Sequence, residues 1–405
     1  MSLLGVVTIF LVAWLLSTAR RSINPRTIVV AFLLQVAIAG FALFVPWGSA
    51  VLDTVVGGVQ KVIDYAYDGI EFVFGPQLKP TLGVTIAFGV LPVIIFFASL
   101  MSLLYYLGIM QRFVGVFGGW LHKLLQTSRT ESVSAASNIF VGHTDAPLVV
   151  RPYLAGMSQS ELFAVMTGGC ATIAGGVMMA YASMGVDLKY LITASFMAAP
   201  GGLLIAKIMM PETEPRPNHA ELVPVVEEEA PANVFEAIGN GSMTGLRIAA
   251  SVGAMLISFV ALIYLLNGIL SGIGGWFGFE QLTLQWLLGK IFSPIAFLLG
   301  VPWGEASIAG SLIGQKLVLN EFYAYVSFMD VQAELSPYTQ LVVIFALCGF
   351  ANFSSIAILL GGLGTVVPER RHDIARLGLR AVIGGTLVNL MNAALAGFFY
   401  TLQAL

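Results

Sequence analysis

The stretch from Gly314 to Tyr325, which reads GQKLVLNEFYAY, interrupts a long apolar region with charged and amide side chains. Within seven positions it holds Gln315, Lys316, Asn320 and Glu321. An ionisable side chain at membrane depth costs roughly 2.5–3.5 kcal/mol, so such residues are rare and usually functional. The flanks, 306–319 and 322–328, are mostly apolar and contain no proline and no Asn-Gly turn. The pattern therefore predicts a short hairpin that dips into the membrane and presents polar groups near its tip. A surface loop between two spans is the alternative.

The composition is that of a polytopic membrane protein. The 405 residues are 58% hydrophobic and 10% charged, whereas soluble domains carry about 25% charged residues. The net charge of −3 says little about a chain embedded in lipid. Cys170 and Cys348 lie in apolar segments and are expected to be small core residues rather than a disulfide or a metal site. Without a recognisable nucleotide or metal motif, we expect no cofactor and no nucleic-acid partner.

Apolar segments predict an all-α fold with about eight transmembrane helices, three interfacial helices and two re-entrant helical hairpins. The expected spans are 3–17, 28–47, 82–107, 162–182, 188–209, 243–270, 338–360 and 383–402. The expected interfacial helices are 49–75, 111–129 and 273–291, and the expected hairpins are 132–154 and 303–328. The first apolar run lacks the basic start and cleavage site of a signal peptide, so it is interpreted as the first span.

Basic segments predict the orientation. Residues 20–26, 112–129 and 370–380 are rich in Arg and Lys, and basic loops face the cytoplasm. An even number of spans separates each pair, which places both termini outside the cytoplasm. The same parity holds if both hairpins cross the membrane fully, so it does not distinguish re-entry from crossing. The proline-rich and acidic segment 211–231 cannot bury an apolar face and is expected to be a mobile linker between two halves.

The two halves resemble each other weakly. Val141–His143 precedes Cys170 in the first half, and Ile313–Gln315 precedes Cys348 in the second. An irregular run of small residues follows each cysteine. Each half supplies an interfacial helix, a hairpin and two spans in that order, which predicts an inverted internal repeat. Many secondary transporters have repeated halves with broken helices around a substrate site at mid-membrane.

The central stretch also carries the pattern Gly-x-Lys-x-x-x-Asn-Glu-Phe-x-Ala-aromatic, which resembles the signature of the concentrative nucleoside transporters. GFANFSSIAI at 349–358 and NIFVGHTDAPL at 138–148 are similar to two further stretches of that family. The resemblance covers nearly the whole chain. It implies a non-enzymatic, cation-coupled importer of nucleosides that works by alternating access, as a lipid-embedded, multi-pass homotrimer in the bacterial inner membrane.

The resemblance also implies a division of the chain. Residues 1–107 form scaffold spans 1–3 with an interfacial helix, and 108–209 form the first repeat. Residues 210–271 form the acidic linker and scaffold span 6, and 272–405 form the second repeat. The repeats are expected to make a transport domain that packs against the scaffold.

The substrate site is carried over position by position. By resemblance, His143, Thr144 and Asp145 contact the nucleobase. Glu321, Asn352 and Ser355 hold the ribose hydroxyls, because a carboxylate is a strong acceptor and Asn and Ser complement it. Phe350 and Val177 form apolar walls. Two alternatives stay open: Asp145 as a plain helix cap before Ala146-Pro147, and His143 as a neutral pocket residue. Lys316 and Asn320 are expected to be structural and to satisfy hairpin carbonyl groups.

Base preference and coupling ion are open at this point. Bacterial members of the family usually have Gln and Glu where this chain has His143 and Asp145, so its base selectivity is not given by the family. A sodium site is implied at Asn138, Val141, Thr172 and Ile173, with proton coupling through His143 as the alternative. The same fold moving another ribosylated or polar solute, such as pseudouridine or purine nucleosides only, is the nearest rival. An intramembrane enzyme or a channel is a more distant one, since nothing orients Ser355 and His143 toward each other.

Overall fold

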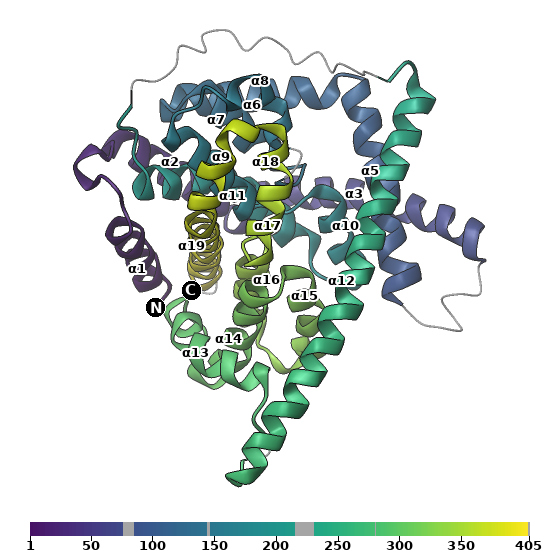
Figure 1. Ribbon diagram of the computed structural model, residues 1–405, viewed down its shortest axis with the longest axis vertical. Helices are drawn as coiled ribbons and strands as arrows, with labels where there is room; N and C mark the ends of the chain where they lie inside the picture. The colour runs from purple at the N-terminus through teal and green to yellow at the C-terminus, as the bar shows by residue number, and fades with distance from the viewer. Residues whose placement is uncertain (76–84, 144–145, 215–230, 280, 404–405) are drawn as a thin grey trace.

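The structure, a computed structural model, describes residues 1–75, 85–143, 146–214, 231–279 and 281–403 (Figure 1). These ranges contain helices and turns and no strand. Six helical segments in them are long and apolar enough to cross a membrane. They are α2 (Pro25–Leu43), α5 with its π-helical start (Ile86–Tyr106), α9 with α10 (Gln159–Met184), α11 (Leu188–Met209), α12 (Val234–Trp276) and the segment ending in α19 (Pro368–Gln403). The all-α membrane fold is confirmed.

The two remaining expected spans correspond to shorter helices. The first is α1 (Ser2–Leu15), and the seventh is broken into α16 (Pro337–Leu347) followed by α17 (Ser354–Gly361) and α18 (Leu363–Val366). Because neither meets the length of a full crossing in one helix, the total of eight spans stays a prediction. The first two expected interfacial segments are helical, as α3 (Pro46–Phe74) and α6 (Ile109–Leu125).

Two expected boundaries are wrong. The segment 273–291 is not one interfacial helix. Helix α12 continues to Trp276, the chain turns where Gly278 has a φ of +72°, and α13 (Leu284–Leu298) starts anew at a Thr283 cap. The basic segment 370–380 is not a loop but the start of α19 (Arg371–Gln403), where Asp373 pairs with Arg370 and Arg376. The sequence pattern identifies only the most apolar part of each helix. Both helices extend beyond that part.

Two helical hairpins stand where the sequence predicts them. Hairpin 1 consists of α7 (Arg129–Ser137), a turn, and a short helical stretch Ala146–Val150 that leads into α8 (Arg151–Leu154). Hairpin 2 consists of α14 (Trp303–Val318) and α15 (Glu321–Val331). Helix α7 begins three residues earlier than expected because Ser128 and Glu131 form a capping box. Asn320 caps α15 by accepting a hydrogen bond from Tyr323 N at 2.8 Å, so its role is structural as expected, but it satisfies an N–H group rather than a hairpin carbonyl group.

Each hairpin packs against a break in a span of its own half. Helices α9 (Gln159–Ala171) and α10 (Gly175–Met184) are separated by residues 172–174, and α16 and α17 by residues 348–353. Gly175 N donates to Phe140 O of hairpin 1 at 2.8 Å, and Phe353 N donates to Leu317 O of hairpin 2 at 3.0 Å. The two donors each follow the cysteine of their half by the same distance in sequence. These bonds pair Phe140 with Leu317, rather than Gly142 with Gly314 as the sequence comparison suggested.

The repeat helices form the interior of the protein. In their most apolar windows, 94% of the residues of α11 are buried, against 22% for α12, which runs along one side of the molecule in Figure 1. Helix α12 contacts α5 through a row of small residues at every fourth position: Ala237, Gly241, Gly245 and Ala249. A Cβ on Gly245 would lie 2.6 Å from Ile95 Cα. Small residues allow such close backbone approach between membrane helices.

The start of α1 and the end of α19 lie near each other, at the left of Figure 1. Ser2 Oγ is 2.9 Å from the Tyr338 hydroxyl, and the Tyr338 ring lies against Tyr400 near the end of α19. Basic side chains lie at the other end of both helices, where α1 ends and α19 begins. There Arg380 Nη2 donates to Leu16 O at 2.7 Å, and Arg370 Nη1 donates to Met157 O at 2.6 Å.

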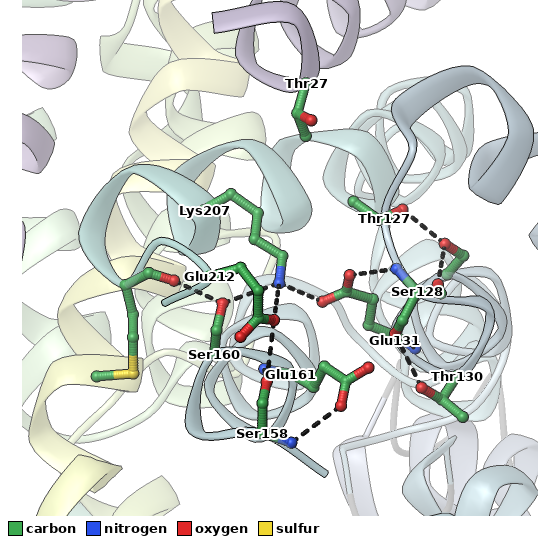
Figure 2. Close-up of polar contacts among 12 residues, drawn as sticks. Thr27, Thr127, Ser128, Thr130, Glu131, Ser158, Ser160, Glu161, Lys207 and Glu212 are labelled. Carbon is green, nitrogen blue, oxygen red and sulfur yellow. Dashed lines mark hydrogen bonds and ion pairs between the residues drawn. The ribbon is translucent and has the colours of Figure 1, made fainter. Parts of the chain in front are cut away.

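A buried polar network fixes the start of hairpin 1 at this basic end (Figure 2). Lys207, near the end of α11, places Nζ 2.7 Å from Glu131 Oε2 and donates to Ser160 Oγ at 2.9 Å. Glu131 and Glu161 are the acidic members of the capping boxes that start α7 and α9. Lys207 therefore ties the first turn of hairpin 1 to the helices on which that hairpin rests.

Candidate functional site

The carboxylate of Glu321 lies where hairpin 2 meets the break between α16 and α17. Glu321 is the first residue of α15 and is 5% exposed. Its Oε2 accepts a hydrogen bond from Asn352 Nδ2 at 3.0 Å, and its Oε1 accepts one from the Tyr181 hydroxyl at 3.2 Å. A carboxylate has about four acceptor positions, so two remain for groups that enter the site.

The break itself presents the other expected ribose contacts. Asn352 Oδ1 accepts from Ser355 N at 2.9 Å and from Ser354 Oγ at 2.6 Å. Ser355 Oγ donates to Phe350 O, which closes the turn around the start of α17. The Oδ1 atom of Asn352 is thus held by the start of α17, and its Nδ2 atom donates to Glu321. The structure brings Glu321, Asn352 and Ser355 together, as the sequence predicts.

His143 faces the same break from hairpin 1. Its ring centroid is 4.7 Å from that of Phe350, and the residue is 6% exposed. Among the described residues, neither ring nitrogen has a hydrogen-bond partner. A buried polar group without a partner is costly, so both nitrogens are available to a polar ligand. Val177, the second expected wall, is buried at the start of α10. Thr144 and Asp145 lie outside the described residues.

The expected cation ligands gather where hairpin 1 meets the break between α9 and α10. Asn138 ends α7 and is 1% exposed, and its amide has no partner on either atom among the residues that the structure describes. A Cβ on Gly168 would lie 3.4 Å from Asn138 Nδ2, so this amide faces the last turn of α9. The Thr172 hydroxyl donates to Gly168 O at 3.1 Å in the same turn.

Val141 and Ile173 flank the bond that joins the hairpin to the break. That bond runs from Gly175 N to Phe140 O, so the backbone of both residues lies at the junction. An unpartnered amide, a hydroxyl and the carbonyl end of a helix are oxygen-rich groups of the type that binds Na⁺ at unwound helices. The residues present therefore fit a monovalent cation.

Two residues around the site, Tyr181 and Asn389, were not found from the sequence, and the partner of a third, Lys316, differs from the expected one. Tyr181 in α10 contacts Glu321, and Asn389 in α19 contacts both helix breaks. Lys316, expected to satisfy hairpin carbonyl groups, donates instead to Ala346 O of α16 at 3.0 Å. A buried Asn within an apolar span is itself a signal of function or specific packing, and Asn389 could have been singled out on that ground.

Comparisons with known proteins cover nearly the whole chain. Residues 4–77 match the family model described as the Na⁺-dependent nucleoside transporter N-terminus, 87–187 match the nucleoside recognition model, and 190–397 match the Na⁺-dependent nucleoside transporter C-terminus. This chain belongs to the concentrative nucleoside transporter family. The resemblance found in the sequence is thereby confirmed.

Individual relatives of this nucleoside transporter agree with the assignment. An uncharacterised transporter of Haemophilus influenzae is 54% identical over 100% of this chain and 98% of its own length. The nucleoside permease NupC of Helicobacter pylori is 51% identical with the same coverage. CNTnw, solved in an inward-facing substrate-bound state, is 51% identical, with a TM-score of 0.95 over 100% of this chain and 98% of its own. The matched relatives are transporters and permeases, so this family member is not an enzyme.

Proposed function

We propose that this protein imports nucleosides across the bacterial inner membrane by alternating access, driven by a sodium gradient. The observation that carries the proposal is the buried Glu321 carboxylate, which Asn352 and Tyr181 hold beside a helix break with two acceptor positions left. Two neighbouring ribose hydroxyls match those positions. The family's name and the nucleoside permease among its relatives support the same substrate class.

The nucleobase would lie between hairpin 1 and the break in the seventh span. Phe350 offers an aromatic face there, and His143 beside it offers one donor and one acceptor in its neutral form. Thr144 and Asp145 follow directly in sequence and complete the proposed base contacts, and Val177 forms the opposite wall. A histidine stands where bacterial members usually have glutamine. The base preference of this chain therefore cannot be carried over from those members and has to be measured.

Sodium is the proposed coupling ion. Asn138, Val141, Thr172 and Ile173 would hold it at the junction of hairpin 1 and α9, because the Asn138 amide is buried without a partner among the described residues. Cation binding would order the turn that carries His143, and it would thereby prepare the base side of the pocket for the nucleoside. Proton coupling is the alternative outcome of the test below.

The orientation follows from the two ends of the molecule. The end that gathers Arg370, Arg380 and the other basic residues would face the cytoplasm. Both termini would then lie outside the cytoplasm. We further propose that the chain assembles as a homotrimer through its scaffold helices, since α12 exposes most of its apolar surface.

Uptake of radiolabelled uridine into proteoliposomes tests the function. Sodium and proton gradients are imposed separately, each with and without an ionophore that collapses it. Uptake driven by sodium alone supports the proposal, and uptake driven only by protons replaces sodium as the coupling ion. Uptake of purine nucleosides or pseudouridine without uridine would redefine the substrate. Failure of all these substrates under both gradients contradicts nucleoside import.

A further inference from the structure

The two broken spans expose two helix ends to each other at the centre of the protein. Helix α9 ends at Ala171 and α16 ends at Leu347. Phe350 N donates to Thr172 O at 3.1 Å, so the two ends meet directly. The last carbonyl groups of a helix have no partner within it, and the dipole adds partial negative charge there. Buried ends of this kind require donors from elsewhere.

Two side chains outside the substrate and cation sites supply those donors. Lys316, at the end of α14, is 2% exposed and donates from Nζ to Ala346 O at 3.0 Å and to Asn389 Oδ1 at 2.5 Å. Asn389, on α19, donates from Nδ2 to Ala171 O at 2.7 Å and to Cys348 O at 2.8 Å. The Lys316 ammonium and the Asn389 amide thus donate hydrogen bonds to carbonyl groups at both helix ends.

The Lys316 charge has no carboxylate partner within ion-pair distance among the described residues. Its hydrogen bonds go to a carbonyl and an amide oxygen, and the helix ends add negative potential to that of the Glu321 carboxylate, which acts on Lys316 from beyond ion-pair distance. The amide is also locked in place. A Cβ on Gly349 would collide with Asn389 Oδ1 and would lie 2.8 Å from Ala171 O.

We propose that Lys316 is a tethered cation that, together with Asn389, positions both helix breaks and thereby couples the cation site to the nucleoside site. Asn389 holds Ala171, the residue before Thr172 of the proposed cation site. It also holds Cys348, just before the Phe350 wall. Lys316 stands in the same hairpin as Glu321. A change at Lys316 therefore reaches both sites although Lys316 is not a proposed ligand of either. This inference rests on the proposed function.

The test compares Lys316→Met, Lys316→Arg and Asn389→Asp with the wild type, as purified protein in detergent. Uridine affinity is measured by calorimetry, and the affinity for the cation that drives wild-type uptake is measured by the thermal shift that it produces. We expect Lys316→Met to weaken both affinities about tenfold or more, since hydrogen bonds from a charged donor are among the strongest. Lys316→Arg should recover part of the loss. Asn389→Asp keeps an acceptor for Lys316, loses both donors, and should also weaken both affinities.

The outcomes separate this inference from its alternatives. Lys189→Met, which removes a lysine paired with Asp53 near the surface, is the control and should change neither affinity. Unchanged affinities in Lys316→Met, loss of uridine affinity alone, or no recovery with arginine would each overturn the proposal. If Lys316→Met does not fold, Asn389→Asp decides. Failure of the wild type to bind any nucleoside contradicts the proposed function instead, and the cation-induced shift still tests the link from Lys316 to the cation site.

Discussion

Replacing Glu321 with glutamine should nearly abolish uptake while it leaves the assembly of the protein intact. Glutamine keeps the volume of the side chain, but it has one acceptor oxygen where the carboxylate has two. The protein already uses both carboxylate oxygens, for Asn352 at 3.0 Å and Tyr181 at 3.2 Å. The new NH₂ group must therefore face either the Asn352 NH₂ group, the tyrosine hydroxyl or the substrate.

The size of the effect follows from the bonds that change. A hydrogen bond to a charged group contributes about 1 kcal/mol more than a neutral one. Two ribose bonds and two internal bonds are affected, so the loss is roughly 2–4 kcal/mol. At about 1.4 kcal/mol for each factor of ten, this corresponds to roughly a 30- to 700-fold loss of nucleoside affinity.

The assay is nucleoside binding by the purified variant, together with uptake into proteoliposomes and the oligomeric state in detergent. Glu334→Gln is the matched control, because it makes the same chemical change at an exposed position just after hairpin 2. The control should bind and transport as the wild type does. If Glu321→Gln binds uridine within about threefold of the wild type, the proposed ribose contact is wrong, whatever its effect on uptake.

Three further substitutions test the packing and polar contacts that hold the helices around the site. Lys207→Met should lower the free energy of unfolding by about 3–5 kcal/mol, since it strands the Glu131 carboxylate, whose side chain is fully buried. Gly349→Ala should abolish transport and destabilise the protein, because its methyl group collides with Asn389. Gly245→Ala should cost about 1–3 kcal/mol, because its methyl group would press on the backbone of α5. Thermal unfolding in detergent measures all three.

Each of these changes has a control of the same chemistry. Lys189→Met removes a partly exposed ion pair, whose partner Asp53 is 57% exposed, and should cost about 0–1 kcal/mol. Gly361→Ala and Gly239→Ala place a methyl group where nothing lies within 4 Å, so neither should destabilise the protein. Equal losses in a variant and its control would show that the named contact is not the cause.

The fold class and the meeting of Glu321, Asn352 and Ser355 could be predicted because both leave local marks in the sequence. Apolar length marks the spans, and polar residues inside them mark the hairpins. Helix ends were less predictable. The basic residues at 370–380 indicate a loop only if a charged segment cannot be helical. Helix α19 nevertheless starts at Arg371 and carries most of these charges in its first turns. In the same way, α12 passes the end of its apolar core without a break.

The contacts between distant segments could not be predicted. Tyr181 reaches Glu321 across 140 positions, and Lys316 reaches Asn389 across 73. No periodicity or spacing in one sequence records such a pairing, because it depends on how separate helices pack, within one half for Lys316 and Asn389 and between the halves for Tyr181 and Glu321. A motif indicates which residue types meet at the site, as with Glu321 and Asn352. It does not show which side chains outside the motif hold them in place.

The ends of α16 and α9 at the centre of the protein differ in whether a side-chain cation lies beside them. This difference predicts how many cations accompany each nucleoside. At the end of α16, the tethered ammonium of Lys316 already meets the carbonyl groups. At the end of α9, the Asn138 amide is buried with no partner among the described residues, and the one free cation of the proposal would bind there. We therefore expect one cation per nucleoside. Uridine uptake measured against sodium concentration should give a Hill coefficient near one, and simultaneous fluxes of labelled sodium and uridine should be equal. A flux ratio of two would show that the protein holds a second mobile cation, and it would contradict the reasoning that Lys316 fills that place.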